Sequence, residues 1–173
     1  MLIILGGLPG SGKTTLAKAL AKHLQATYLR IDSIEQAIKN SMLKVVEVID
    51  VGYLVGYALA KDNLTLGQIV IADSVNSIGI TRKAWVDVAA SVKCNFVEIE
   101  IMCSDKSEHK KRIETRKAEM SGHILPDWEK VENRDYEVWK SNPIIIDTAD
   151  KTVENSIKEL LEKLQPFLGK SSA

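Results

Sequence analysis

Short apolar runs alternate along the chain with longer segments of helical period. Most of the runs are rich in Ile and Val and lack strict polar alternation: Leu2–Leu5, Thr27–Ile31, Gln68–Ala72, Phe96–Met102 and Ile144–Ile146. Strands that are buried on both faces of a parallel sheet have this pattern. The runs therefore predict the strands of a parallel sheet that is covered by helices on both sides.

Between the runs, apolar residues recur at the spacing of amphipathic helices. Three stripes stand out: Leu16, Ala17, Leu20, Ala21 and Leu24; Ala84, Trp85, Val88, Ala89 and Val92, with Thr81 as the expected cap; and Val153, Ile157, Leu160, Leu161 and Leu164, with Pro166 as the expected stop. Alternating strands and helices predict a three-layer α/β domain.

Two segments interrupt this alternation. Ser33–Asp62 is a long, mostly helical insertion between the second and third strands, and residues 109–132 are highly charged. In a nucleotide-binding fold, these are the places for an acceptor-binding region and a lid. A length of 173 residues predicts a single domain over residues 1–173, with a flexible tail at 169–173.

A phosphate-binding motif follows the first strand. The pattern GxxxxGK[ST] is complete, and the next threonine opens the following helix: Gly7, Leu8, Pro9, Gly10, Ser11, Gly12, Lys13, Thr14 and Thr15. Glycines let several backbone N–H groups point at a phosphate, and the helix N-terminus adds a partial positive charge. Lys13 would contact the β- and γ-phosphates, and the Thr14 hydroxyl would ligate Mg²⁺. The motif predicts a bound nucleoside triphosphate.

The nucleotide is expected to be ATP. GTP-binding proteins read guanine with an Asn-Lys-x-Asp type motif near the end of a late strand. In this chain the last strand is followed by Asp147-Thr148-Ala149, which does not match.

Acidic residues end two of the strands, where ligands collect in parallel sheets. Asp32 follows the second strand and could take a proton from an acceptor hydroxyl, or simply cap the helix that begins at Ser33. Asp73 closes the third run in the manner of a Walker B carboxylate and is expected to hold Mg²⁺, often through water. Ser74 and Asn76 follow as acceptor contacts or as ordinary turn residues.

The charged segment supplies candidate phosphate-binding arginines. Asp105 and Glu108 have capping-box spacing for a helix start. Arg112 and Arg116 are four residues apart, share a helix face and are suited to hold phosphate oxygens and the transferring charge. The alternative is a solvated face on which Arg112 pairs with Glu108. Arg134 is a further candidate for binding phosphate.

Composition excludes several classes of protein. Lys and Arg number 23 and Asp and Glu number 23, so no global positive field exists to hold nucleic acid or an anionic membrane. The two cysteines, Cys94 and Cys103, lack the spacing of a redox pair or zinc site and are expected to be small core residues in a reduced compartment. No apolar stretch is long enough to span a membrane, which predicts a cytoplasmic protein.

With these motifs, the chain resembles the P-loop small-molecule kinases, the group of chloramphenicol phosphotransferase, zeta toxin and the kinase domain of polynucleotide kinase. It is most similar to bacterial kinases that are often described only as AAA family ATPases. The resemblance covers most of the chain and includes four segments beyond the phosphate loop: residues 30–37, 62–64, 72–76 and 112–116. It implies a nucleoside-kinase-like sheet of five parallel strands in the order 2-3-1-4-5, with a helical lid.

The resemblance also implies roles for single residues. Asp32 would be the general base, Arg116 would act from the lid, and Arg112 would lie near adenine. One residue departs from the pattern, because many relatives carry Arg three positions after that Asp and this chain has Glu35. A carboxylate there would repel an acceptor phosphate, which favours a neutral or cationic hydroxyl compound.

The expected function is therefore a kinase that transfers the γ-phosphoryl group of ATP, with Mg²⁺, to a hydroxyl of a small molecule. Lys13, Asp32 and Arg116 are the expected catalytic residues, and Thr14 and Asp73 the expected metal ligands. Two alternatives stay open: an ATP-hydrolysing regulatory protein without a small-molecule acceptor, and a polynucleotide or toxin-type kinase. Neutral charge and Glu35 count against a nucleic-acid partner, and the sequence leaves the oligomeric state undetermined.

Overall fold

A computed structural model describes residues 1–42, 45 and 47–169. In this part of the chain, five strands form one parallel sheet in the order β2-β3-β1-β4-β5. The strands are β1 (Leu2–Gly6), β2 (Thr27–Arg30), β3 (Val70–Asp73), β4 (Phe96–Met102) and β5 (Ile144–Asp147). The predicted fold class, strand order and parallel arrangement are confirmed.

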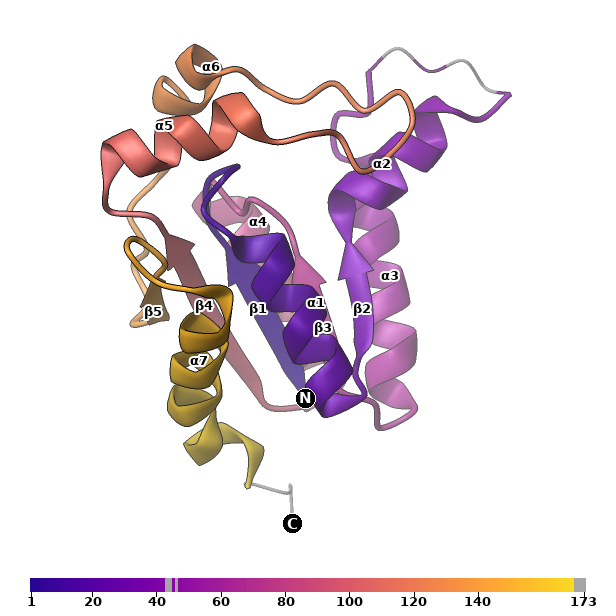
Figure 1. The fold of residues 1–173 in the computed structure, drawn as a ribbon. Coiled ribbons are helices and arrows are strands. Elements are labelled where there is room, and N and C mark those ends of the chain that lie inside the picture. Colours follow the sequence, from indigo (N-terminus) through magenta and orange to yellow (C-terminus); the bar gives the residue numbers. More distant parts are fainter. Residues whose placement is uncertain (43–44, 46, 170–173) are drawn as a thin grey trace.

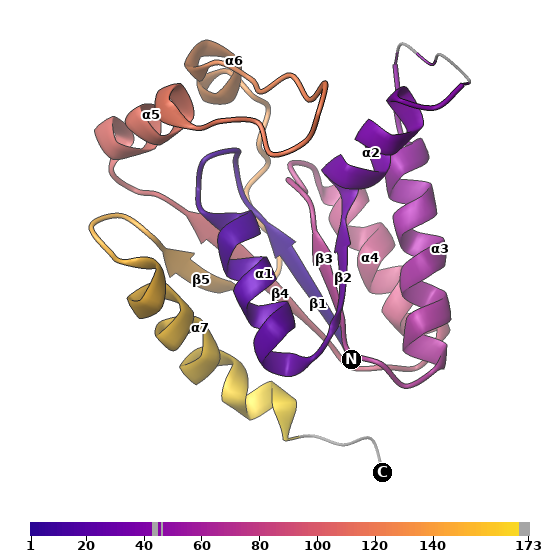
Figure 2. The same cartoon turned by 45° about the vertical axis from the view of Figure 1, so that its right-hand side comes forward.

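Helices cover both faces of this sheet (Figures 1 and 2). The helices are α1 (Lys13–Leu24), α2 (Ile31–Lys39), α3 (Val51–Thr65), α4 (Gly79–Ser91), α5 (Lys106–Thr115), α6 (Trp128–Glu132) and α7 (Val153–Leu168). Helices α1 and α7 pack on one face, and α3 and α4 pack on the other. Helices α5 and α6 lie beyond the carboxyl ends of the strands (Figure 1).

Strand β1 shows why the apolar runs lack polar alternation. Ile3 and Leu5 face the core formed with α1 and α7, whereas Leu2 and Ile4 face the core formed with α3 and α4. All four side chains are fully buried. A strand with two buried faces needs apolar residues at every position, as the sequence pattern indicated.

Several predicted boundaries are wrong. Thr81 does not cap α4: Ile78 is the N-cap, and Thr81 lies inside the first turn, where its hydroxyl donates to the Ile78 carbonyl at 3.0 Å. Pro166 does not stop α7, which continues to Leu168, because a proline in the last turn removes only one backbone hydrogen bond. The predicted flexible tail, apart from Gly169, falls outside the described residues.

Two helix ends near the cleft also differ from expectation. Arg30 is the N-cap of α2, so Asp32 is not a capping residue and lies within the first turn. Helix α5 ends at Thr115, so Arg116 follows it in extended conformation and does not share a helix face with Arg112. Asp105 does cap α5 by accepting from the Glu108 N–H at 2.8 Å, but the Glu108 carboxylate bonds elsewhere, so only half of the expected capping box forms.

Among the described residues, none of the helices combines the length and the hydropathy needed to cross a lipid bilayer. Cys94 and Cys103 are both free thiols at partly buried positions, so neither is the fully buried core residue that was expected.

Candidate functional site

A cleft of about 800 Å³ opens at the carboxyl edge of the sheet. Its walls come from segments far apart in the sequence: the loop after β1, the start of α2, the loop after β3, the segment between α5 and α6, and the loop after β5. Every strand of a parallel sheet ends at the same edge, which explains how these segments meet. Figure 2 shows the segment after α5 passing over this edge.

The loop between β1 and α1 has the backbone of a phosphate cradle. Gly7, Gly10 and Gly12 have φ values of 144°, 84° and 89°, a region that side chains disfavour. Gly12 caps α1 without a side chain, so no side-chain oxygen occupies the N–H groups at the start of this helix. These N–H groups and the helix dipole favour an anion at this position.

Lys13 and Asp73 form a buried ion pair beneath the loop. The Lys13 Nζ lies 2.6 Å from Asp73 Oδ1, and the Tyr28 hydroxyl donates to Asp73 Oδ2 at 2.7 Å. Burial alone would raise the pKa of Asp73, but the Lys13 charge, together with hydrogen bonds from Lys13, Tyr28 and Thr14, holds it below its usual value. Asp73 is therefore ionised at neutral pH and close to the Thr14 hydroxyl.

The donor set of Thr14 and Asp73 fits a magnesium ion that is completed by phosphates and water. A hydroxyl and a carboxylate are hard oxygen ligands of the kind Mg²⁺ prefers, and Mg²⁺ keeps several waters when it binds with nucleotides. Among the described residues no group of three or more His, Cys, Asp or Glu side chains could hold a metal by itself.

Asp32 lies on the cleft wall between two arginines. Its Oδ2 is 3.7 Å from Nη2 of Arg30, and its charge also acts on Arg116. Burial lowers the pKa of Arg116, and the negative charge of Asp32 partly offsets that effect. The structure therefore places Asp32 and Arg116 on the wall of one cleft, where their charges interact, even though 84 positions separate them in the sequence.

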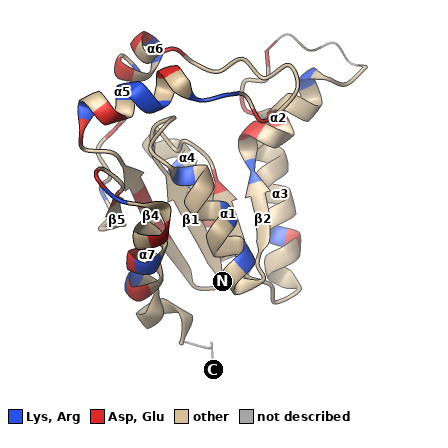
Figure 3. Cartoon of the chain, in the orientation of Figure 1, with Lys and Arg blue, Asp and Glu red and all other residues tan. Residues whose placement is uncertain are grey.

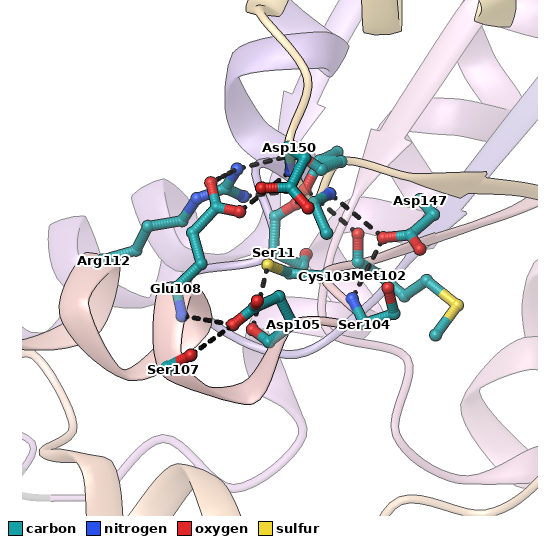
Figure 4. A network of polar contacts seen from close by, with 12 residues as sticks. Ser11, Met102, Cys103, Ser104, Asp105, Ser107, Glu108, Arg112, Asp147 and Asp150 are labelled. Carbon is teal, nitrogen blue, oxygen red and sulfur yellow. Dashed lines mark hydrogen bonds and ion pairs between the residues drawn. The ribbon is translucent and has the colours of Figure 1, made fainter.

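Arg112 has a different environment from Arg116. Its Nη1 donates to Thr148 Oγ1 at 2.7 Å, and its Nη2 donates to Glu108 Oε1 at 2.6 Å and to the Thr148 carbonyl at 2.9 Å. Thr148 Oγ1 in turn donates to the Ser11 carbonyl at 2.9 Å. Figure 4 shows this network joining α5, the loop after β5 and the phosphate loop. The pair of Arg112 with Glu108, which was the alternative to a phosphate-binding role, forms and fixes the guanidinium against the cleft wall.

Helix α5 also packs directly on the phosphate loop. The His109 ring Nε2 lies 2.7 Å from the Pro9 carbonyl, and the ring meets the Trp128 ring edge to face at 5.4 Å. Ile113 packs against Gly10, where an added Cβ would lie 2.6 Å from its Cδ1. The phosphate loop and the charged segment thus form a continuous packed surface.

Gly10→Ala should therefore weaken nucleotide binding by about tenfold, because a left-handed backbone angle and a close contact together cost about 1–2 kcal/mol. Gly10 is constrained in two ways, by its positive φ of 84° and by its contact with Ile113. Gly67→Ala is a suitable control, since its φ is also positive, at 80°, but an added Cβ there meets no atom within 4 Å. Titration calorimetry with an ATP analogue measures the difference, and equal affinities for the two variants would contradict it.

The segment at residues 116–127, between α5 and α6, crosses the cleft to α2. Arg116 Nη2 donates to the Pro126 carbonyl at 3.2 Å, which folds the segment back on itself. Glu119 Oε2 accepts from Lys18 Nζ at 2.8 Å and from Arg30 Nη1 at 2.7 Å. Asn40 Nδ2 reaches the Ser121 carbonyl at 3.5 Å. The segment therefore contacts α1, the end of β2 and α2.

The far side of the cleft, next to Asp32, is lined by Glu35, Tyr53, Ser74 and Arg134. Burial and the nearby Asp32 charge raise the pKa of Glu35, while Lys39 and Arg134 act in the opposite direction. Arg134 therefore lies close enough to Glu35 to offset part of its charge. Among nearby aromatic residues, Tyr53 lines the cleft, whereas Tyr57, Trp85 and Trp128 pack elsewhere.

Positive charge is concentrated in this cleft although the chain as a whole is neutral. Figure 3 marks the charged positions along the ribbon, including Lys and Arg on α5 and on the segment that follows it. Of the residues that the structure describes, nine cationic and three acidic side chains line the cleft: Lys13, Arg30, Lys39, Arg112, Arg116, Lys117, Lys130, Arg134 and Lys151, against Asp32, Glu35 and Glu119. Such an excess in a concave site attracts polyanionic ligands. The binding of a nucleotide requires such a local excess of positive charge, which the net charge of the chain does not reveal.

The loop after β3 is held by a buried arginine. Arg82 donates to the carbonyls of Asn76 at 2.7 Å and Glu137 at 2.7 Å, and its guanidinium lies 4.2 Å from the Trp139 ring centroid. Asn76 itself is fully buried and donates to the Leu5 carbonyl at 2.8 Å. Asn76 thus has a structural role, whereas Ser74 lines the cleft.

Arg82→Met should lower the free energy of unfolding by about 3 kcal/mol, because charge-assisted hydrogen bonds to buried carbonyls are lost and their acceptors stay buried. The neighbouring Lys83→Met is the control: Lys83 makes only an exposed ion pair with Asp87, and such pairs contribute about 0–1 kcal/mol. Urea unfolding measures both. Equal stability of the two variants would show that Arg82 does not hold this loop.

Several residues of the site had no individual role in the sequence-based prediction, among them Tyr28, Arg30, His109 and Thr148. Each makes its contact with a segment that is distant in the sequence. Of these residues, only Arg30 and Thr148 could have been identified as site residues from the sequence, because they lie at the carboxyl ends of strands.

Comparisons with known proteins agree with this geometry. The model of the AAA domain family matches residues 2–133. No curated protein matches the chain significantly. Among solved structures, Kti12 of Chaetomium thermophilum in complex with ADP-AlF3 aligns with a TM-score of 0.72 and 22% identity, covering 98% of this chain and 100% of that one.

Two kinases of small molecules are also similar in structure. The gluconokinase of Sinorhizobium meliloti 1021 aligns with a TM-score of 0.67 and 16% identity over 95% of this chain and 91% of its own. The APS kinase CysC of Mycobacterium tuberculosis, in complex with AMPPNP and APS, aligns with a TM-score of 0.68 and 17% identity over 95% and 96%. At these identities the likeness establishes the fold that the chain shares with them.

Proposed function

Because this chain belongs to the AAA domain family and has a P-loop kinase-like fold, we propose that it transfers the γ-phosphoryl group of ATP to a hydroxyl of a small molecule. One observation carries the proposal: a phosphate loop, a carboxylate and an arginine from three separate segments line the same cleft. These are the loop at Gly7–Thr14, Asp32 at the start of α2, and Arg116 after α5. A regulatory protein that only binds and hydrolyses a nucleotide needs the phosphate loop, but it does not need a general base for an acceptor hydroxyl beside that loop.

Each residue of the cleft has a role in this reaction. Residues 7–15 bind the phosphates through backbone N–H groups, and Lys13 leaves Asp73 to contact the β- and γ-phosphates. Thr14 and Asp73 would hold Mg²⁺, which would neutralise charge on the phosphate oxygens. Arg112, fixed against Thr148, forms the wall near the loop after β5, and Arg134 serves the acceptor side near Glu35.

Asp32 acts as the general base. Its carboxylate accepts the proton of the acceptor hydroxyl, whose oxygen forms a bond to the γ-phosphorus while the bond from that phosphorus to the β–γ bridging oxygen breaks. ADP leaves with the electron pair of the broken bond, and Asp32 later returns its proton to water. Arg116 stabilises the charge that develops on the transferring group.

In this proposal, the charged region at residues 109–132 is the lid over the cleft. Its contacts with the phosphate loop, α1 and α2 enclose the cleft and would limit access of water to the γ-phosphate. Exclusion of water is what separates transfer from hydrolysis.

The direct test incubates the protein with ATP, Mg²⁺ and a library of hydroxyl compounds, and detects phosphorylated products by mass spectrometry. We expect at least one compound to gain a phosphoryl group in an amount that matches the ADP formed. ATP hydrolysis that a protein partner stimulates, with no phosphorylated product, would contradict the proposal and favour a regulatory ATPase.

A further inference from the structure

Arg30 is a largely buried arginine with unused donor capacity at the edge of the cleft. Its side chain is 13% exposed, its Nη1 donates to Glu119 at 2.7 Å, and its Nη2 lies 3.7 Å from Asp32 Oδ2. Its Nε is buried and has no hydrogen-bond partner among the described residues. A guanidinium has five N–H donors in a fixed plane, so this one can bind a larger anion than it now does.

The anion that Arg30 now binds is a carboxylate of the protein itself. One oxygen of Glu119 accepts from both Arg30 Nη1 and Lys18 Nζ, at 2.7 Å and 2.8 Å. The two cations belong to regular elements, β2 and α1, whereas Glu119 belongs to the irregular segment 116–127 and is 54% exposed. Ion pairs with so exposed a partner contribute about 0–1 kcal/mol, so another anion can displace Glu119 at small cost.

We propose that Arg30 and Lys18 form a subsite for an anionic group of the acceptor, a carboxylate or a phosphate, and that Glu119 occupies this subsite in its absence. This inference rests on the proposed function and specifies its substrate class: a hydroxyl compound that also carries an anionic group. The subsite adjoins the base, since Arg30 and Asp32 are two residues apart at the end of β2. An acceptor held there by its anion can place a hydroxyl against Asp32.

The subsite is separate from the phosphate loop. In the sheet, β3 lies between β2, which ends at Arg30, and β1, which leads into the phosphate loop. Arg30 and Glu119 line the same cleft as the phosphate loop, as donor and acceptor sites must, and Lys18 reaches Glu119 from α1.

The charges around Glu35 remove the objection to an anionic acceptor. From the sequence, Glu35 favoured a neutral or cationic compound. In the structure, burial and the Asp32 charge raise the pKa of Glu35, which disfavours its charged form, and the positive charges of Lys39 and Arg134 offset part of the negative charge that remains. An added Cβ at Gly52 would clash with the Glu35 side chain, which shows how closely Glu35 packs against α3. Cationic side chains exceed acidic ones on the cleft wall as a whole, by more than the phosphates of one magnesium-bound nucleotide would neutralise.

Matched acceptors with and without an anion test the proposal: gluconate against glucitol, glycerate against glycerol, and glycerol 3-phosphate as the phosphate counterpart. We expect kcat/KM to be higher for the anionic member of a pair. Arg30→Met should raise KM for anionic acceptors at least about tenfold and change KM for neutral ones less than about threefold, because charge-assisted bonds to a carboxylate or phosphate are lost. The gluconate and glycerol 3-phosphate arms distinguish a carboxylate from a phosphate.

Glu119→Gln is the decisive variant because its position is exposed and the change is isosteric. If Glu119 occupies the subsite, its neutralisation should lower KM for anionic acceptors about fivefold. If Glu119 only fastens the segment over the cleft, the same change should raise KM for every acceptor and overturn the proposal. Lys18→Gln should act like Arg30→Met, more weakly, whereas Lys22→Gln, an exposed lysine on the same helix, is the control.

A binding measurement separates this inference from the proposed function. With the phosphate loop saturated by Mg²⁺ and a non-hydrolysable ATP analogue, sulfate and acetate are titrated and followed by NMR. Binding that Glu119→Gln strengthens and Arg30→Met abolishes supports the subsite even where no compound is phosphorylated. Sulfate and acetate affinities that are the same in wild type and Arg30→Met would overturn the subsite while leaving a kinase of neutral acceptors intact.

Discussion

Lys13→Ala should reduce the affinity for ATP by at least about a hundredfold, because it removes the cation that would contact the β- and γ-phosphates in a partly enclosed site. Activity should fall with it. Titration calorimetry with Mg²⁺ and an ATP analogue measures the change, and Lys22→Ala, an exposed lysine on the same helix, should bind like wild type. Undiminished affinity of Lys13→Ala would refute the role of the loop.

A second effect of Lys13→Ala must be separated from the first. Lys13 is the ion-pair partner of Asp73, which is almost fully buried, so its loss leaves a buried charge unpaired and should destabilise the unliganded protein by about 3–5 kcal/mol. In wild type, the depressed pKa of Asp73 contributes stability that is present above the unfolded-state pKa and is lost as pH falls through the folded-state pKa. In Lys13→Ala, burial raises the pKa of Asp73 instead.

The destabilisation by Lys13→Ala should therefore shrink as the pH falls, first through the raised pKa of Asp73 in the variant and then below about 4, where the wild type also loses the contribution of its depressed Asp73 pKa. Urea unfolding of both proteins at neutral and acidic pH measures this. The double variant Lys13→Met with Asp73→Asn, which removes both charges, should recover much of the stability but none of the nucleotide affinity. That result separates folding from binding.

Asp32→Asn should lower kcat for phosphoryl transfer by about 10²–10⁴-fold, the usual contribution of a general base. Asparagine keeps the size of the side chain and one oxygen for Arg30, but it cannot accept the proton of the acceptor hydroxyl. Rapid-quench measurement of ADP and phosphorylated product gives kcat, and the affinity for ATP should stay within about threefold because Asp32 lies outside the phosphate loop.

The control for Asp32→Asn is Asp62→Asn, an exposed carboxylate on α3 outside the cleft lining. It should keep wild-type kcat. If Asp32→Asn turns over ATP and acceptor like wild type, Asp32 is not the base. If Asp32→Asn loses both ATP affinity and kcat, Asp32 acts in nucleotide binding instead. Its assignment as the general base is then wrong as well.

Much of the fold was predictable from local pattern. The run Leu2–Leu5 specifies a buried strand because each position faces a covering layer of helices, whereas Phe96–Met102 alternates, with Val97, Ile99 and Ile101 buried and both ends exposed. The ends of helices were less predictable. Arg116 was expected on a helix that stops at Thr115, and Pro166 was expected to stop a helix that continues to Leu168. The positions of helix ends depend on capping and on tertiary contacts, which the periodic pattern of apolar residues does not indicate.

The sequence by itself determined the phosphate loop, because the glycine positions, Lys13 and Thr14 are contiguous and their spacing matches the backbone that a phosphate requires. It also placed Asp32 and Asp73 at strand ends. Only the tertiary structure decided which groups surround them: Tyr28 on Asp73, Arg116 near Asp32, and Glu119 on Arg30. Those contacts join segments up to 89 residues apart. Only the folding of the chain brings residues so far apart in the sequence close together, so no local sequence pattern predicts these contacts.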